Sequence, residues 1–589
     1  MGSSSYWKML KNRFINKINP HVLLIVLIII CIYEYGIQKI CGFTMYPDEF
    51  GYWATAAPAV GYDWSETASL GSYYSFGYSL ILVPILKIFS GGVKAYRAAM
   101  FINMLLMCVG VLLFGKIIGK VFYKTKAGVR ILISGAAVLY PAWIFYMQMT
   151  MVEAVLFFVF SLTVYLFYNF MEKQKISTAI ALTAALIYGY CLHMRTVGIV
   201  IACVFVCLFR LISTKGNKQG NIKAIFILFG VLALLFVSAL FLKDLIIDTV
   251  FSYAEQDALA VNDYGSQWGK LIGIFTLAGM KKFVCGVVGK LYYLGLASFG
   301  TFYWAMAWCL KESIRLIGRT IRKEKVYPRQ WLALFLLLSV IGQVLISSIY
   351  MYDTDVIDCL VYGRYNELLV PVTIIIGLVM MSRSRFLIPM TVSIGAVLGG
   401  ITFLLLHVIE AGNMSGIRGY HIAGISYLWQ EDYMDVRSYF WLTWLLGFSL
   451  MMLVCILVWI GSRWRNMWWL YAGILMMEIV AGLQISAHYT YRVNDLNYEN
   501  LRIAEILEEK SAEDIGILYL DEGNPPFVDF LQMQIPETPI HVIRENELSS
   551  IDVQNNIVIT DAETGQDETL DRMFDKKIST NMFCLYYNQ

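Results

Sequence analysis

The stretch Thr44–Ala57, TMYPDEFGYWATAA, decides how the rest of the chain is interpreted. Its two adjacent carboxylates, Asp48 and Glu49, stand among aromatic residues directly after the first apolar run of the sequence. Charge close to hydrocarbon is costly, so acidic residues at a membrane boundary commonly mark a functional site. The alternative is that both acids cap the short helix that follows Pro47, since a carboxylate at a helix start satisfies free N–H groups.

The composition of the 589-residue chain is that of a polytopic membrane protein, with 58% hydrophobic residues, 15% charged residues and a mean hydropathy of +0.61. A soluble fold of this size would not carry so much apolar surface. The net charge of +3 gives no indication of nucleic-acid binding. The eleven cysteines are scattered and the six histidines form no i,i+4 pair, so neither a disulfide framework nor a zinc site is indicated.

The apolar runs predict about thirteen membrane spans, each near the length of about 20 residues that a bilayer requires. These runs are 20–39, 95–121, 129–147, 153–171, 176–192, 196–212, 223–242, 283–310, 330–351, 367–381, 386–407, 438–460 and 466–486. A further run, Ser79–Phe89, is short and contains Pro84. If it lies along the outer interface, the basic loops all share the cytosol with the basic N-terminal cluster, as the positive-inside bias requires.

This topology places the N-terminus, with an uncleaved first anchor, in the cytoplasm and the C-terminus outside. After Asn494 the sequence changes to polar helical text, followed by three short β-type runs, IGILYL, PIHVI and NIVITD. We therefore predict an all-α transmembrane domain over 1–490, in which 42–94 is a first outer loop with interfacial helices. Residues 491–589 are predicted to form a small extracytoplasmic α/β domain with a parallel sheet.

Further polar residues fall on the predicted outer side, together with Asp48 and Glu49. Glu153 opens an apolar run, Arg195 interrupts YGYCLHMRTVGIV, and Arg364 precedes a late span. Arg195 could instead extend from a hairpin tip to the interface. A carboxylate can accept the proton of an attacking hydroxyl, and arginines can stabilise a departing phosphate. The combination suits transfer of a sugar from a lipid-phosphate donor.

The motif YPDEFGYW resembles the acidic signature in the first outer loop of the GT-C glycosyltransferases, which include protein O-mannosyltransferases and the lipid A aminoarabinose transferase. The resemblance extends to the long first loop, to YRAAMFIN and to PAWIFYMQMTMVEA. It implies a GT-C fold and inverting transfer from a polyprenyl-phosphate sugar to a hydroxyl of a cell-envelope glycan, lipid or protein. The reaction would occur on the outer face of a bacterial cytoplasmic membrane, among membrane lipids and without nucleic acid.

The resemblance also implies roles for individual residues. Asp48, Glu49 and Glu153 would be the catalytic carboxylates, with Asp48 as base, or with Asp48 and Glu49 as ligands of a divalent cation such as Mg²⁺ or Mn²⁺. The candidate ligands of the donor phosphate are Arg195, Arg364, Tyr365 and Tyr74. Many relatives carry a basic His-Pro-Pro or Lys-Pro before the interfacial helix, whereas this chain reads SYYSFGYS at 72–79, so its phosphate contacts must come from other residues.

Two other functions stay open at this point. A transporter or flippase of lipid-linked glycans would share the spans and the intramembrane charges, but it should show two related halves with broken helices. No such symmetry is visible in the sequence, and an odd number of spans argues against it. A catalytically silent relative whose outer domain binds cell-wall glycan would tolerate loss of Asp48, whereas an enzyme would not.

Overall fold

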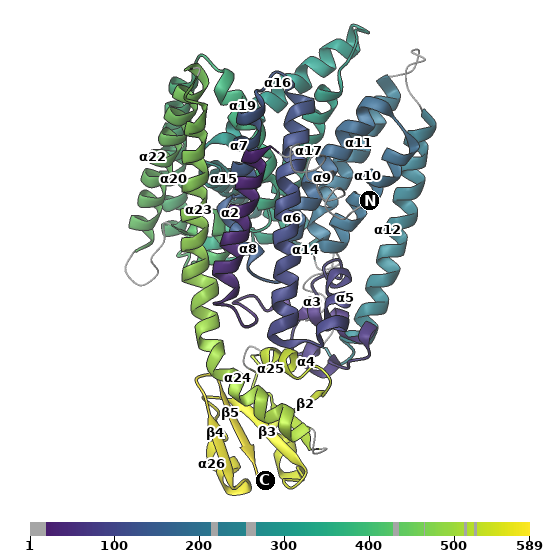
Figure 1. Ribbon diagram of the computed structural model, residues 1–589, viewed down its shortest axis with the longest axis vertical. Coiled ribbons are helices and arrows are strands. Elements are labelled where there is room, and N and C mark those ends of the chain that lie inside the picture. The colour runs from purple at the N-terminus through teal and green to yellow at the C-terminus, as the bar shows by residue number, and fades with distance from the viewer. Residues whose placement is uncertain are drawn as a thin grey trace, which may run out of the picture.

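The computed structural model describes residues 19–213, 222–254, 267–427, 435–464, 466–511, 515–523 and 527–588. A tall helical domain carries a small α/β domain at one end (Figure 1). This division agrees with the predicted fold class. The basic N-terminal cluster that supports the predicted topology, within positions 8–17, lies outside the described residues.

The helical domain consists of long apolar helices and a few short ones. The long helices are α2 Pro20–Ile37, α6 Gly92–Val121, α7 Ala127–Val138, α9 Val152–Lys173, α10 Ile176–Leu192, α11 Val197–Ser213, α12 Ile222–Val250, α15 Leu277–Ala297, α16 Thr301–Ile321, α17 Pro328–Met351, α19 Val370–Arg383, α20 Leu387–Ala411, α22 Val436–Arg463 and α23 Ala472–Ser486. The short ones include α8 Pro141–Met147, α14 Gln267–Gly273, α18 Ile357–Leu360 and α21 Ala423–Ser426.

Nine helices in the described ranges are long and apolar enough to cross a membrane, and the number rises to eleven if each of two bent pairs is one span. The prediction of a multi-span helical domain is therefore confirmed. The number thirteen stays a prediction, because helices such as α10, with 17 residues, and α19, with 14, are shorter than a straight crossing requires.

Two predicted spans follow a different course from the straight helices expected. The run 129–147 is divided into α7 and α8, which meet at 58° just before Pro141. The run 283–310 is divided into α15 and α16, which meet at 112°. The second turn passes through Phe299 and Gly300, whose φ angles of 49° and 78° are incompatible with a continuing helix. Apolar residues continue through both turns, so the turns cannot be recognised from hydropathy alone.

The loop between α2 and α6, predicted to be the first outer loop, contains three short helices, α3 Asp48–Ala56, α4 Ser65–Ser69 and α5 Ser79–Phe89. α5 has the bounds predicted for the interfacial segment, and it packs against α3 and α6. The N–H of Gly77 donates to the carbonyl of Cys191 at the end of α10, over 2.7 Å. A side chain at Gly77 would come within 2.4 Å of the Leu192 nitrogen, so only glycine fits. These contacts hold α3 over the ends of the spanning helices.

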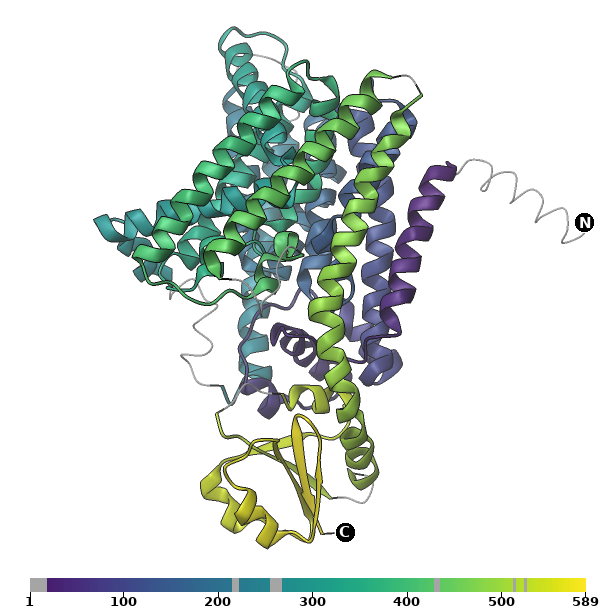
Figure 2. The ribbon, with the colours of Figure 1, turned by 90° about the vertical axis from the view of Figure 1, so that its left-hand side faces the viewer.

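The α/β domain continues directly from the last span. α23 passes through a π-helical turn, Ala487–Tyr491, into α24, Arg492–Ser511 (Figure 2), so the predicted boundary at 490 falls within continuous helix. The strands, in the order β2-β1-β3-β5-β4, are β1 Gly516–Leu520, β2 Ile540–Ile543, β3 Asn556–Asp561, β4 Lys576–Ser579 and β5 Phe583–Tyr587, with helices α25 Asp529–Gln534 and α26 Asp567–Met573. The first three strands are parallel, as predicted, and the unpredicted β4 and β5 add an antiparallel edge.

The α/β domain is hydrogen-bonded to the segment between α2 and α6. The side-chain oxygen of Asn494 accepts hydrogen bonds from the N–H groups of Cys41 and Gly42, over 2.8 and 3.0 Å. Glu66 in α4 accepts a hydrogen bond of 2.8 Å from the N–H of Val542 in β2. The domain therefore lies on the same end of the molecule as the acidic motif of α3.

Candidate active site

Four charged residues that are far apart in the sequence form one buried chain. Arg364 pairs with Asp48 through Nη2, and its Nε donates to Glu153 Oε1 over 2.9 Å. Arg195 donates from Nη2 to the same Glu153 oxygen, also over 2.9 Å. Each of the four is at most 6% exposed. The charges alternate in the order Asp48, Arg364, Glu153, Arg195, and we call this set the charged chain.

Each member of the charged chain stands at the end of an element. Asp48 begins α3, Glu153 lies in the first turn of α9, and Arg195 lies in the short helix η3, Met194–Thr196, after α10. Arg364 follows α18 in the loop before α19. All four therefore occupy one end of the spanning helices, as their predicted outer location requires, and the structure brings them into direct contact.

The charged chain is neutral in sum but incompletely hydrogen-bonded. Two carboxylates balance two guanidinium groups, which is the condition for burying such charges. Burial lowers the pKa of Arg364, but the charges of Asp48 and Glu153 outweigh it and hold that pKa above its usual value. Glu153 Oε2 and the Nε and Nη1 atoms of Arg195 have no hydrogen-bond partner in the described protein. Buried polar atoms of this kind require water or a ligand.

Aromatic rings fix the planes of both arginines. The guanidinium carbon of Arg364 lies 4.8 Å from the ring centroid of Tyr46, and that of Arg195 lies 4.4 Å from the ring of Tyr365. The Tyr46 hydroxyl donates to the carbonyl of Tyr420 over 2.7 Å, which holds its ring in place. Tyr46 is not among the site residues predicted from the sequence, although it stands two positions before Asp48 in the acidic motif.

Glu49 lies in a different environment from its neighbour. Its Oε1 accepts hydrogen bonds from the N–H and hydroxyl of Thr44, over 2.8 and 2.5 Å. Its Oε2 accepts from the Tyr96 hydroxyl over 2.6 Å and from the N–H and hydroxyl of Thr150 over 2.8 and 2.7 Å. Complete burial raises the pKa of Glu49, and hydrogen bonds from Thr44, Tyr96 and Thr150 oppose the rise. Glu49 thereby joins the first loop to α6 and to the turn before α9.

This arrangement does not fit a divalent cation held jointly by Asp48 and Glu49. A hard cation needs several oxygen ligands with free lone pairs. Both Glu49 oxygens are already occupied by neutral donors, and Asp48 is turned to Arg364. Within the ranges that the structure describes, no group of three or more His, Cys, Asp or Glu side chains is arranged to hold a metal ion.

An apolar cavity of about 330 Å³ opens beside the charged chain. Arg195 and Tyr365 lie at its polar end, and α14 and α17 supply most of its apolar wall. The residues that line it are His193, Met194, Arg195, Val197, Trp268, Leu271, Ile346, Ile349, Tyr350 and Tyr365. Tyr74, the remaining candidate phosphate ligand, packs over Gly51 of α3 and is not part of this lining.

A histidine and a carboxylate that the sequence analysis did not place in the site support the Arg364 loop. His421, in the short helix η5 Gly419–Ile422, pairs through Nδ1 with Asp358 Oδ2. Its carbonyl accepts the N–H groups of Gly363 and Arg364, over 3.1 and 3.0 Å. Burial lowers the pKa of His421, and the neighbouring Asp358 only partly offsets this. His421 therefore positions Arg364.

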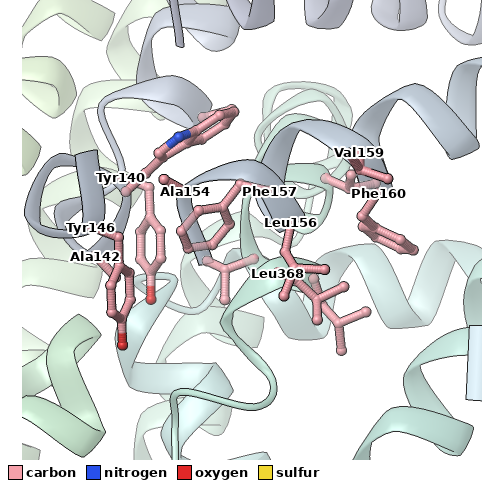
Figure 3. Packing of buried hydrophobic residues seen from close by; sticks show 14 of the residues in the cluster. Tyr140, Ala142, Tyr146, Ala154, Leu156, Phe157, Val159, Phe160 and Leu368 are labelled. Atoms are coloured by element: carbon pink, nitrogen blue, oxygen red, sulfur yellow. The ribbon is translucent and has the colours of Figure 1, made fainter. Parts of the chain in front are cut away.

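The wall behind Glu153 is aromatic. Tyr140, Tyr146 and Phe157 pack together at the start of α9 (Figure 3), and the Phe157 ring centroid lies 6.1 and 6.2 Å from those of Tyr140 and Tyr146. All three are completely buried. In such a buried and largely apolar environment, electrostatic interactions of the charged chain are stronger than at a surface.

Solved structures with a similar fold include that of ArnT. ArnT from Cupriavidus metallidurans, in the apo state, aligns with a TM-score of 0.52 and 13% identity over 96% of this chain and 97% of its own. The same protein bound to undecaprenyl phosphate aligns over the same shares with a TM-score of 0.51 and 10% identity. The Archaeoglobus fulgidus oligosaccharyltransferase aligns with a TM-score of only 0.46 and 11% identity, over 93% of this chain and 70% of its own. No protein-family model and no curated protein matches the sequence. The chain has the GT-C fold of ArnT.

Proposed function

We propose that this protein is a glycosyltransferase that moves a sugar from a polyprenyl-phosphate donor to a hydroxyl of a cell-envelope glycan, lipid or protein, with inversion. The observation that carries the proposal is the buried charged chain beside an apolar cavity. The first requirement of the reaction is a place for a lipid chain next to its phosphate. A neighbour of the same fold, ArnT, binds undecaprenyl phosphate, which supports this class of donor.

The arginines are the proposed receptors for the donor phosphate. Arg195 has two unpaired guanidinium nitrogens and lies at the polar end of the apolar cavity. Guanidinium groups bind phosphate oxygens through charge-assisted hydrogen bonds in a fixed geometry. The phosphate would therefore lie against Arg195 and Arg364, with Tyr365 beneath Arg195 and the isoprenoid chain along the cavity wall. Tyr74, which packs over α3 and does not line the cavity, would contact the phosphate from the α3 side.

Asp48 is the proposed general base. A phosphate that engages Arg364 competes with Asp48 for that guanidinium, so donor binding would release the carboxylate from its ion pair. Asp48 then accepts the proton of the acceptor hydroxyl while the hydroxyl oxygen forms a bond to the anomeric carbon. The bond between that carbon and the phosphate oxygen breaks, and the phosphate departs with its negative charge against the arginines. No general acid is needed, because phosphate is a good leaving group.

The other two acids have supporting roles in this proposal. Glu153 holds Arg195 and Arg364 with one oxygen and so sets the spacing of the two phosphate receptors. Glu49 shapes the site by fixing α3, which carries Asp48. We assign the site to the outer face of a bacterial cytoplasmic membrane, with the N-terminus inside and the α/β domain outside, on the distribution of basic residues.

The test is a transfer assay on purified full-length protein in detergent, with a panel of radiolabelled polyprenyl-phosphate sugars and cell-envelope acceptors, with and without chelator. A flippase only moves its substrate from one side of a membrane to the other. It would therefore form no glycosylated acceptor in detergent micelles, which have no second compartment. The proposal expects labelled acceptor with at least one donor. Absence of product with every donor, together with movement of a lipid-linked glycan across proteoliposomes, would establish the transporter instead.

A further inference from the structure

A second cavity, of about 540 Å³, lies at the opposite end of the membrane domain from the charged chain. α6 connects the two ends. It begins next to Gly91, which packs against Pro536 of the α/β domain, and its last residue, Val121, lines this second cavity. A helix of 30 residues spans about 45 Å. The wall is completed by α16 between Trp304 and Arg315, by the end of α19, by the start of α17 and by Met390 of α20.

The charges around this cavity are strongly unbalanced. Glu312 is the single carboxylate among the described residues that line it, and it is 5% exposed. Its two oxygens lie 2.6 Å from Arg315 Nη1 and 3.6 Å from Arg329 Nε. The five basic residues of the lining are Lys124, Lys311, Arg315, Arg329 and Arg383. One buried carboxylate cannot neutralise five cations, so the cavity presents a large net positive charge.

Three of these cations have no acidic partner. No carboxylate in the described part of the chain lies within ion-pair distance of Lys124, Lys311 or Arg383. Arg383 donates to the Thr125 hydroxyl over 3.1 Å, and its guanidinium carbon lies 5.4 Å from the ring centroid of Phe122. Its remaining N–H groups are therefore available to an anion.

The floor of the cavity is aromatic. Phe122 and Trp308 meet edge to face with centroids 5.3 Å apart, and Trp304 and Trp308 are each 7% exposed. Met380 and Met390 extend the apolar part of the lining. Aromatic side chains of this kind are characteristic of the boundary between lipid headgroups and hydrocarbon. The positive-inside bias accounts for basic residues at this end, but not for their convergence on one aromatic-floored cavity.

We propose that this cavity is a binding site for the phosphate headgroup of an anionic membrane lipid. Basic pockets between spanning helices on the cytoplasmic side bind such headgroups, and the arginine forks match phosphate oxygens. The aromatic floor would contact the glycerol and the first methylenes of the acyl chains. A soluble phosphate compound would offer the same anionic group without the chains, so a test must separate the two sources.

The experiment counts lipids retained by the full-length protein, by native mass spectrometry, after exchange into micelles doped with phosphatidylglycerol or phosphatidylcholine. The test variant is Lys124→Gln/Lys311→Gln, which leaves the Glu312 pairs untouched. The matched control is Lys173→Gln/Lys175→Gln. These two lysines are exposed and do not line the cavity. They lie at the same end of the helices as the cavity, because Glu172, which precedes Lys173, pairs over 3.0 Å with Lys120 near the end of α6.

The proposal expects the wild type and the control to retain phosphatidylglycerol in preference to phosphatidylcholine. The test variant should bind phosphatidylglycerol at least about tenfold more weakly, since each cation near a headgroup contributes about fivefold, and added salt should weaken binding in all three. Equal retention by the test and control variants would overturn the site. If inorganic phosphate or glycerol phosphate competes as well as the lipid does, the lipid assignment is overturned in favour of a soluble phosphate. Thermal unfolding of each variant excludes misfolding, and Arg383→Gln provides an independent second variant.

Discussion

Asp48 and Glu49 are adjacent in the sequence but belong to two different regions of the molecule. The Asp48 carboxylate lies in the charged chain, where a single guanidinium holds it and where neighbouring polar atoms are unpaired. The Glu49 carboxylate lies in a socket of five neutral hydrogen-bond donors from Thr44, Tyr96 and Thr150. A reactive carboxylate needs a lone pair that a substrate can reach. The socket leaves none, whereas an ion pair can be exchanged for a phosphate.

The comparison predicts that the two acids fail in different ways when they are neutralised. The largest effect is expected for Asp48→Asn. The amide retains an oxygen toward Arg364 but cannot accept a proton, so transfer should fall by a factor of about 100 or more, as for loss of a general base. The rate of product formation per folded molecule is the measurement. A rate within about threefold of the wild type would remove Asp48 from the base role.

Glu49→Gln should act on stability instead. The NH2 group of the glutamine cannot accept a hydrogen bond. In one orientation of the amide it would face the N–H and hydroxyl donors of Thr150 and Tyr96, and in the other it would face those of Thr44. Either orientation leaves buried donors without an acceptor. We expect the free energy of unfolding to fall by about 2–3 kcal/mol, with transfer per folded molecule almost unchanged. Thermal unfolding in the same detergent measures this, with Glu34→Gln in α2 as a control acid outside the socket. An unaltered unfolding temperature would mean that the socket is not structural.

Arg195→Gln should weaken donor binding more than it slows a bound donor. The variant removes the two unpaired guanidinium nitrogens of a residue that lines the cavity, and it leaves Arg364 beside Glu153 and Asp48. We expect KM for the lipid donor to rise about tenfold, the effect of one charge-assisted hydrogen bond to phosphate. Arg418→Gln, at an exposed position in the loop between α20 and α22, is the matched control. A fall in kcat at constant KM would assign Arg195 to the transition state rather than to donor binding.

The smallest expected effect is on the pH dependence of stability. It comes from His421, which supports the loop that carries Arg364. The pKa of His421 is lowered in the folded protein by burial, against the attraction of Asp358 and with repulsion from Arg364 and Arg418. The unfolded chain therefore binds the proton more readily. Stability from this group is present above the ordinary histidine pKa and is lost as pH falls through the lower folded value.

Between neutral pH and about pH 5, His421→Gln should accordingly lose less stability than the wild type. Unfolding temperatures of the two proteins across this range provide the measurement, and the His407→Gln variant in α20 serves as control because that side chain is exposed. Parallel curves for the wild type and His421→Gln would show that the His421 proton is not linked to folding.

The sequence could predict the composition of the charged chain but not its contacts. Charge placement puts Asp48, Glu153, Arg195 and Arg364 on one side of the membrane because each stands at a helix end. It cannot separate Asp48 from Glu49, since the partners of Glu49 include Tyr96 and Thr150, 47 and 101 positions away. The apolar cavity escapes prediction for the same reason: its walls come from segments that only the packing of helices brings together.

The fold shows the same limit. Hydropathy locates the spanning runs and α5, and short runs of β-type residues locate β1, β2 and β3, because these signals are local. The turn at Phe299 and Gly300 is embedded in apolar text, and β4 is too short and polar to signal a strand. Such features depend on neighbours distant in sequence, so they appear only in the folded chain.

The most direct test of the account is transfer per folded molecule for Asp48→Asn and Glu49→Gln, measured side by side with the unfolding temperature of each. We predict that Asp48→Asn is folded and loses at least about 100-fold in transfer, whereas Glu49→Gln unfolds at a lower temperature and keeps its turnover. The reverse pattern, or equal losses of turnover in both variants, would contradict the assignment of chemistry to the charged chain and of structure to the socket.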